Sequence, residues 1–241
     1  MKILIITGGS KGIGKAIAKK YASENYQVYA LSRNSAALKN SIEVSVDLSN
    51  PIEAETTCRK LLGELQYKEI SSITLVNNAG RLGKISSLEN LEREDISKTV
   101  QLNITTPLVV SSLFIKFLEK NTCKKQIINI SSGAAKNPYQ GWTVYCSSKA
   151  AMDMMTRTIA TEQMGIENGV KCVSIYPGVV DTHMQTQIRN TNEKDFNSLQ
   201  RFKDLKENNE LYTPEFVAEK IYKMDTELLL KNGDILDLRN F

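Results

Sequence analysis

Short, nearly uninterrupted apolar runs alternate along this chain with longer segments in which apolar residues recur every three or four positions. The short runs predict strands buried on both faces, and the longer spacing predicts helices packed on one side. We expect six strands at residues 3–7, 27–32, 42–46, 73–77, 126–131 and 170–176, and a final short strand at 235–237. We expect helices at residues 13–23, 51–66, 93–119, 143–167 and 214–224.

This alternation of strands and helices predicts the fold class. Strands separated by helices form right-handed βαβ units, so we expect an α/β protein with a Rossmann-type doubly wound parallel sheet in three layers. No linker or repeat interrupts residues 1–241, which predicts a single domain. Only residues 183–211, polar and rich in Asn after Pro177-Gly178, break the pattern. We interpret this segment as a mobile helical insertion that covers the substrate.

Composition narrows the classes of function. The formal net charge is +4 without a block of five like charges, so a nucleic-acid partner is not expected. The sequence contains no run of about 18 apolar residues, the length that a membrane helix needs. The first apolar run is too short for a signal peptide. The four cysteines lack a CxxC spacing and His183 is the only histidine. We therefore expect reduced thiols, a cytoplasmic location and no metal site.

Glycines at positions 8, 12 and 14 lie directly after the first predicted strand and open the first predicted helix. Glycine allows the tight turn and the close approach of the backbone, and a helix N-terminus attracts a pyrophosphate. This context predicts a dinucleotide-binding loop, with an ordinary strand–helix turn as the alternative.

The end of the second predicted strand indicates which dinucleotide binds. Sites for NAD place an acidic residue there, next to the ribose 2′-hydroxyl. This chain has Ser32-Arg33-Asn34 instead, and Lys11 adds a second cation in the glycine loop. A guanidinium can hold a 2′-phosphate through two hydrogen bonds. The pattern predicts NADPH/NADP+ as the cofactor, unless both cations are merely solvated.

Tyr145 and Lys149 are the candidate chemical groups. A spacing of four places them on one face of a helix, and an ammonium near a phenol is expected to lower the pKa of the phenol toward neutrality. Ser131-Ser132 ends an apolar run thirteen residues before Tyr145. Alone, the Tyr–Lys pair is a weak signal, because two exposed residues of a helix have the same spacing.

Further motifs stand in a fixed order along the chain. Asp47 follows the third predicted strand, Asn77-Asn78-Ala79-Gly80 follows the fourth, Asn103 lies in the next helix, and Pro177-Gly178 follows the sixth strand. Together with the glycine loop, Ser132 and the Tyr145–Lys149 pair, they make the chain resemble the short-chain dehydrogenase/reductase family over essentially its whole length.

The resemblance implies roles for individual residues. Tyr145 would donate a proton, Lys149 would lower the pKa of Tyr145 and hold the nicotinamide ribose, Ser132 would bind the substrate carbonyl, and Asn103 would anchor a water. The implied cofactor contacts are Gly8, Ser10, Lys11, Gly12, Ile13, Gly14, Arg33, Asn34, Asp47, Leu48, Asn78, Ala79, Gly80, Tyr145, Lys149, Pro177, Gly178, Val180, Thr182 and Met184.

Residues 141–154 and 176–185 are similar to the sepiapterin reductase and benzil reductase subgroup. This resemblance implies an NADPH-dependent carbonyl reductase whose small-molecule substrate is a vicinal dicarbonyl. Asp237 stands where sepiapterin reductase anchors its pterin, although a solvated residue near a chain end is an equal alternative. The candidate substrate contacts are Ser132, Tyr139, Trp142, Tyr145, Met184 and Asp237.

Two other functions stay open. A 3-oxoacyl-carrier-protein reductase would favour a basic rim, for which the chain offers only Lys136 and Arg189. A non-catalytic NADP-sensing protein is disfavoured by the intact catalytic set. Family members commonly form homodimers or homotetramers through the helix that carries Tyr145, and Met152 and Met155 are candidate contacts there, with core packing as the alternative.

Overall fold

Seven parallel strands form one sheet in this computed structural model, which describes residues 1–227 and 230–241. The order across the sheet is β3-β2-β1-β4-β5-β6-β7, so successive strands are added outward in one direction from β1 to β3 and in the opposite direction from β4 to β7. The strands are β1 (Lys2–Thr7), β2 (Gln27–Ser32), β3 (Ser41–Ser45), β4 (Ser72–Asn77), β5 (Lys124–Ile130), β6 (Lys171–Tyr176) and β7 (Ile235–Asp237). The predicted doubly wound sheet is thereby confirmed.

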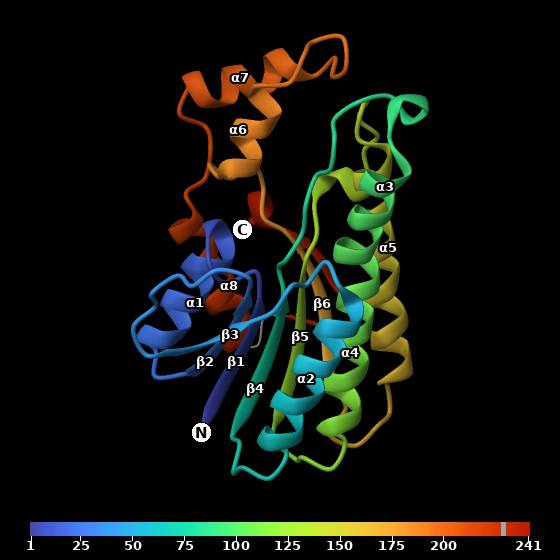
Figure 1. The fold of residues 1–241 in the computed structure, drawn as a ribbon. Helices are drawn as coiled ribbons and strands as arrows, with labels where there is room; N and C mark the ends of the chain where they lie inside the picture. Colours follow the sequence, from blue (N-terminus) through green and yellow to red (C-terminus); the bar gives the residue numbers. More distant parts are fainter. Residues whose placement is uncertain (228–229) are drawn as a thin grey trace.

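Helices cover both faces of the sheet, with α1 and α8 on one side and α2, α4 and α5 on the other (Figure 1). Their bounds are α1 (Gly12–Ser23), α2 (Pro51–Leu65), α3 (Arg93–Val100), α4 (Thr106–Phe117), α5 (Thr143–Glu162), α6 (His183–Arg189), α7 (Leu199–Glu207) and α8 (Pro214–Thr226). Short helical turns occupy Leu88–Asn90, Gly133–Ala135 and Leu238–Asn240.

Alternating residues of the strands build two separate cores. Along β1, Ile3 and Ile5 pack with α2, α4 and α5, whereas Leu4 and Ile6 pack with α1 and α8. Successive side chains of a strand point to opposite faces, so an unbroken apolar run fills both cores at once. This is why the central strands are apolar at nearly every position.

Local signals fix where the helices begin. The side chain of Asn50 accepts hydrogen bonds from the backbone N–H groups of Ile52 and Glu53, at 3.2 and 3.3 Å, and Pro51 is the first residue of α2. Thr213 caps α8 in the same way, and Pro214 follows it. A polar cap followed by proline satisfies the exposed N–H groups of the first turn.

The predicted helix over residues 93–119 consists of three parts. A π-helical turn, Gln101–Thr105, joins α3 to α4. The combined stretch Arg93–Phe117 is long enough and, with a mean hydropathy of 1.3 over its best window, apolar enough to cross a membrane, although it lacks an uninterrupted apolar run. In the fold, Val110, Leu113 and Phe114 of α4 pack into the core beside α2.

The helix α5 is shorter than the sequence predicted, and its methionines lie on unexpected faces. It ends at Glu162 instead of residue 167. Met152 and Met155, considered for a subunit contact, are 2 % and 8 % exposed and belong to the core, while Met154 is 58 % exposed. The helical period places positions three apart on the same face and the intervening position away from it.

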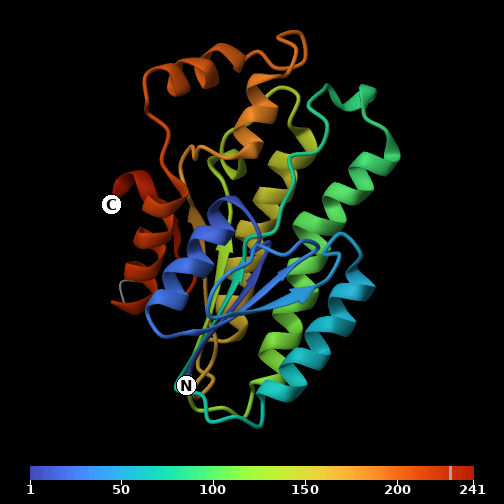
Figure 2. The ribbon, with the colours of Figure 1, turned by 60° about the vertical axis from the view of Figure 1, so that its left-hand side comes forward.

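Residues 183–211 form α6, α7 and their connections, beyond the end of the sheet from which β6 leads into them (Figures 1 and 2). Phe196, between these helices, stacks on Trp142 with ring centroids 4.8 Å apart and an interplanar angle of 11°. The side-chain amide of Gln187 donates to the carbonyl of Gly83 at 2.8 Å. Residues 183–211 therefore pack, through aromatic and polar contacts, on the loops at the carboxyl ends of the strands.

Candidate active site

A cavity of about 1350 Å³ opens at the carboxyl ends of the central strands. Parallel α/β sheets bind their ligands at this edge, next to the point where the order of the strands reverses. Every residue predicted to contact cofactor or substrate lines the cavity, except Gly14 and Asp237. Of the four predicted catalytic residues, Ser132, Tyr145 and Lys149 line it and Asn103 does not.

The glycine loop forms one end of the cavity, and two of its glycines are required by the backbone. Gly12 has a φ of +53°, and a Cβ on Gly14 would lie 2.3 Å from the carbonyl oxygen of Gly8. Gly14 therefore acts by letting α1 pass close to the loop, which explains its absence from the cavity wall.

Contacts between the ends of β1 and β4 hold this loop in place. The hydroxyl of Thr7 accepts hydrogen bonds from the backbone N–H groups of Asn78 and Ala79, at 3.0 and 3.1 Å. The amide of Asn78 donates to the carbonyls of Thr7 and Gly8, at 3.0 and 3.2 Å. Asn78 thus acts as a brace of the loop in addition to lining the cavity.

The N-terminus of α1 faces the cavity with its backbone N–H groups available. Lys11 occupies the N-cap position without a side-chain hydrogen bond, and the first turn contains no acidic residue. Gly12 and Ile13, the first residues of the helix, line the cavity. Such a helix end is a site for a phosphate group.

Arg33 and Asn34 line the same end, directly after β2. The hydroxyl of Ser32 donates to the carbonyl of Asn34 at 2.8 Å, which fixes the turn. Asp47 is nearby, and its carboxylate accepts hydrogen bonds from the backbone and hydroxyl of Ser49 at 2.9 and 2.7 Å. These bonds lower the pKa of Asp47, with Arg33 adding a smaller electrostatic contribution.

Tyr145, in the first turn of α5, is 7 % exposed and lines the cavity beside Ser132. Burial raises the pKa of its phenol to about 12, and a polar contact with the Ser132 hydroxyl opposes this only in part. The sequence predicted a lowered pKa, and this expectation is wrong for the structure. Desolvation of the phenolate outweighs the influence of nearby groups.

Lys149 explains the difference, because its ammonium is engaged elsewhere. Its Nζ donates to the carbonyl of Ile130 at 2.7 Å and lies 5.8 Å from the ring centroid of Tyr145. Burial lowers the pKa of Lys149 to about 8, partly offset by the charge of Asp153. At the high pH where this phenol titrates, an amine with a pKa of about 8 is neutral and does not stabilise the phenolate.

Asn103 is fully buried in the π-helical turn, and both ends of its side-chain amide are hydrogen-bonded to protein groups. Its Oδ1 accepts from the backbone N–H of Arg81 at 2.9 Å, and its Nδ2 donates to the carbonyl of Arg81 and the hydroxyl of Ser148, at 2.8 and 3.0 Å. Asn103 therefore ties α5 to the segment after β4.

Aromatic side chains form the opposite end of the cavity. Tyr139 and Trp142 lie with ring centroids 4.8 Å apart, and Phe202 of α7 lies 5.6 Å from Trp142. The indole Nε1 of Trp142 is buried without a hydrogen-bond partner among the residues that the structure describes. Trp142 lines the cavity as the centre of this aromatic cluster.

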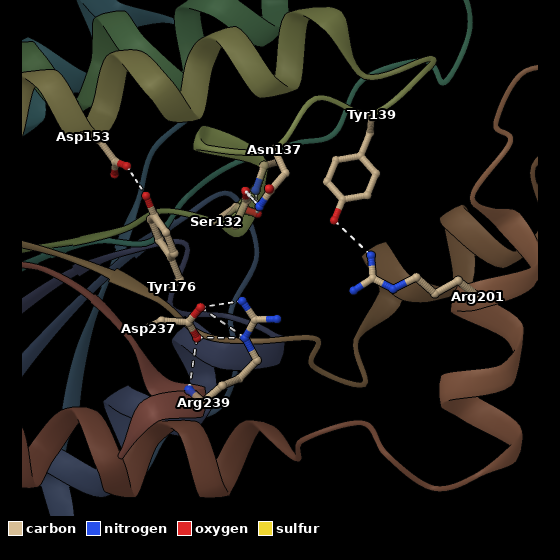
Figure 3. A network of polar contacts seen from close by, with 10 residues as sticks. Ser132, Asn137, Tyr139, Asp153, Tyr176, Arg201, Asp237 and Arg239 are labelled. Carbon is tan, nitrogen blue, oxygen red and sulfur yellow. Dashed lines mark hydrogen bonds and ion pairs between the residues drawn. The ribbon is translucent and has the colours of Figure 1, made fainter.

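Asp237 differs from its predicted place. Its carboxylate is paired with Arg239, whose Nε donates to both carboxylate oxygens at 2.9 and 3.1 Å and whose Nη2 donates to Oδ2 (Figure 3). Hydrogen bonds from Arg239 lower the pKa of Asp237. Arg239 lines the cavity and Asp237 does not, because the intervening Leu238 turns the chain and is itself buried.

Sequence reasoning missed several residues of the cavity wall. They include Leu82, Tyr176, Gln185, Arg201, Phe202 and Arg239. The spacing of Leu199 and Phe202 on one helical face is a signal that could have shown α7 packing inward, whereas the direction of Arg239 depends on a short turn near the chain end. Tyr176 is oriented by a hydrogen bond from its hydroxyl to Asp153 (Figure 3).

Comparisons with known proteins agree with this geometry. The family model for short chain dehydrogenases matches residues 2–193. A benzil reductase ((S)-benzoin forming) from Bacillus subtilis is 41% identical over 243 residues, covering 100% of both chains. A sepiapterin reductase from Xenopus laevis is 28% identical, covering 98% of this chain and 94% of that protein.

Solved structures show the same fold. A short chain dehydrogenase/reductase from Saccharomyces cerevisiae has a TM-score of 0.83 at 26% identity, covering 98% of this chain and 96% of that one. A 3-ketoacyl-(acyl-carrier-protein) reductase from Brucella melitensis complexed with NADH has a TM-score of 0.81 at 22% identity, with the same coverage, and supports the fold alone. This chain belongs to the short chain dehydrogenase family, whose members use a nicotinamide cofactor, and is an oxidoreductase acting on carbonyl or hydroxyl groups.

Proposed function

We propose that this chain is an NADPH-dependent reductase that converts one carbonyl of an aryl vicinal dicarbonyl to the hydroxyketone. The observation that carries the proposal is the cavity itself, in which Ser132 and Tyr145 stand between a glycine loop and an aromatic wall. The likeness to a benzil reductase at 41% identity over the full chain supports the substrate class.

The residues present fit a dinucleotide. The close contact of Gly14 with Gly8 and the uncapped first turn of α1 provide a cradle for a pyrophosphate. Lys11 and Arg33 would hold the 2′-phosphate of NADP(H), because Ser32 stands where an acidic residue would select NAD(H). The remaining predicted cofactor residues that line the cavity would complete this site.

The bound reduced cofactor would supply a hydride to the carbonyl carbon. Negative charge then develops on the carbonyl oxygen, and two hydroxyl groups stabilise it. Tyr145 donates its proton, since a pKa of about 12 keeps the phenol protonated at neutral pH. Ser132 donates a hydrogen bond to the same oxygen, and Lys149 holds the ribose. Asn103 acts by positioning α5, through its bond to Ser148.

A vicinal dicarbonyl suits this site chemically. Each carbonyl withdraws electrons from its neighbour, which makes the first reduction easier than the second. Tyr139, Trp142 and Phe202 offer flat surfaces on which an aryl group can stack. The site fits a pterin less well than an aryl diketone, because both oxygens of Asp237 already accept hydrogen bonds from Arg239. Residues 183–211 would cover the bound substrate.

The assembly and location form part of the proposal. The exposed apolar side chains of Leu108 on α4 and Met154 on α5 suit a homodimer or homotetramer built on these helices. All four cysteines are free thiols, which suits a cytoplasmic location.

The test is oxidation of NADPH by the wild-type chain and by Tyr145→Phe with four substrates: benzil, sepiapterin, diacetyl and an acetoacetyl thioester. We expect benzil to give the highest kcat/KM, a preference for NADPH over NADH, and a loss of about 10²–10⁴ in kcat for Tyr145→Phe. Faster turnover of the acetoacetyl thioester would replace the proposal by a carrier-protein reductase. Cofactor binding without turnover of any substrate would favour an NADP sensor.

A further inference from the structure

We infer that Arg239 binds the second oxygen of the substrate, the acceptor oxygen on the carbon next to the reacting carbonyl, and that Asp237 positions Arg239 for this task. The inference rests on the proposed function, and it names the residue that would distinguish a vicinal dicarbonyl from a simple carbonyl.

The position of Arg239 is the first argument. Its side chain lines the same cavity as Ser132 and Tyr145. A Cβ placed on Gly133, the residue after Ser132, would lie 3.9 Å from Nη2 of Arg239. In Figure 3, the guanidinium and Ser132 face the same region of the site. A substrate whose first oxygen contacts Ser132 therefore has its adjacent atoms near this guanidinium.

The free donors of Arg239 are the second argument. A guanidinium carries five N–H donors in a fixed plane. Asp237 occupies the edge formed by Nε and Nη2. Nη1 makes no hydrogen bond to any residue within 1–227 or 230–241. The outer edge of the guanidinium can therefore donate to a ligand oxygen while Asp237 holds the inner edge.

The charge balance favours a neutral ligand oxygen. Asp237 is ionised at neutral pH, since Arg239 and, with a smaller contribution, the charge of Lys136 lower its pKa, so Asp237 offsets the charge of Arg239 itself. A carboxylate on the substrate would gain from Arg239 and be opposed by Asp237 at a similar distance. A keto oxygen accepts the same hydrogen bond without this repulsion, so we assign the contact to the second carbonyl of a diketone.

The remaining walls agree with such a substrate. Arg201 of α7 donates to the hydroxyl of Tyr139 at 3.1 Å, which orients that ring at the opposite side of the cavity (Figure 3). Gly178, after β6, has a φ of +78°, and a Cβ there would lie 3.6 Å from Cγ of Arg239. The stem of Arg239 thus packs closely on the Pro177-Gly178 turn, which limits where its guanidinium can go.

The experiment compares two substrates that differ in the second oxygen. 1-Phenyl-1,2-propanedione has it, and 4-nitrobenzaldehyde is an activated aryl carbonyl without it. The variant Arg239→Met keeps an unbranched apolar stem and removes the guanidinium with its donors. We expect kcat/KM for the diketone to fall roughly tenfold to hundredfold, the range for a charge-assisted hydrogen bond. The value for the aldehyde should change less than about twofold.

Two further variants sharpen the result. Asp237→Asn keeps the shape of the brace but weakens it, and should lower diketone selectivity less than Arg239→Met does. Arg59→Met is the matched control, because Arg59 is also paired with a carboxylate, that of Glu55 at 2.6 Å, and lies outside the cavity wall. It should leave the selectivity unchanged, and melting temperatures and NADPH affinity show whether each variant is folded.

Several outcomes would overturn the assignment. An unchanged diketone rate in Arg239→Met, or an equal loss with the aldehyde, would remove Arg239 from substrate recognition. A loss confined to phenylglyoxylate, tested as the anionic counterpart, would mean that the guanidinium binds a carboxylate. In each case the wild-type chain still reduces the diketone, so the proposed function survives. Failure of the wild type on every aryl dicarbonyl would instead refute the proposed function.

Discussion

Burial controls the chemistry of the two titratable residues at the centre of the site. Tyr145 stays protonated well above neutral pH, with a pKa of about 12, which is the state that a proton donor in a reduction requires. Lys149 has a pKa of about 8, so it is mostly charged at neutral pH and loses its charge under mildly alkaline conditions. The low-dielectric surroundings disfavour both charged forms, the phenolate and the ammonium.

The lowered pKa of Lys149 predicts how stability depends on pH. Between its folded pKa of about 8 and its ordinary pKa of 10.5, the unfolded chain binds more protons at this residue than the folded chain does. Stability from this residue should therefore rise with pH through that window. Urea unfolding of the wild type and Lys149→Met at pH 7, 8, 9 and 10 measures it.

The comparison of the wild type with Lys149→Met isolates the titration of Lys149, because groups far from it, such as the buried Cys58, titrate identically in both proteins. We expect the free energy of unfolding of the wild type, relative to the variant, to increase from pH 8 upward by at most about 1.4 kcal/mol per pH unit. A difference that stays constant from pH 7 to 10 would show that Lys149 keeps an ordinary pKa when folded.

Single residues are also where sequence reasoning reached its limit. The glycine loop, Ser132 and the Tyr145–Lys149 pair could be placed because each depends on short spacings along one strand or helix. The pairing of Asp237 with Arg239 could not, since the direction of a side chain in a short terminal turn depends on what packs around it. The pKa of Tyr145 was misjudged because burial cannot be read from a four-residue spacing.

At the scale of elements, residues 183–211 make the substrate end of the cavity different from its cofactor end. Phe196, Leu199 and Phe202 of residues 183–211 pack on Trp142, next to Tyr139. The predicted mobility of this segment stays a prediction. Its contacts indicate instead how it would shape the aryl site, through a stack of aromatic rings anchored on the start of α5.

Removing one ring from this stack should weaken the binding of the substrate more than the binding of the cofactor. Phe196 is fully buried against Trp142, and aromatic pairs contribute about 0.5–1.5 kcal/mol beyond their buried area. We expect Phe196→Ala to raise the KM for benzil about threefold to tenfold. The Kd for NADPH should change little, because the glycine loop is at the other end of the cavity.

Steady-state kinetics and a fluorescence titration with NADPH measure the two quantities. Phe241→Ala serves as control, since Phe241 is 56 % exposed and lies outside the cavity wall. An equal weakening of substrate and cofactor would indicate that Phe196 supports the whole fold instead of the substrate end.

Elements were predicted well where the pattern is regular. The bounds of β2 and β7 agree with the sequence prediction, because polar residues mark the ends of the apolar run in the buried β2 and of the short, partly buried β7. The π-helical turn at Gln101–Thr105 was missed, because an extra residue per turn changes the hydrogen bonding and leaves the apolar period nearly intact. That turn places Asn103 toward Arg81 and Ser148.

For the whole molecule, the topology explains why residues far apart in sequence share one site. The glycine loop follows β1, Asn78 follows β4, Ser132 follows β5 and Pro177 follows β6, and these strands are neighbours in the sheet. The order of motifs therefore becomes an order across the cavity, from the pyrophosphate cradle to the aromatic wall. This arrangement underlies both the fold prediction and the proposed reduction of an aryl dicarbonyl.

The stoichiometry of benzil reduction tests the central claim most directly. Benzil is incubated with excess NADPH and the wild-type chain, and both NADPH consumption and products are followed to completion. We expect one NADPH to be consumed per benzil, with benzoin as the accumulating product, because a second carbonyl without an activating neighbour is reduced far more slowly. Consumption of two equivalents with formation of the diol, or no consumption at all, would contradict it.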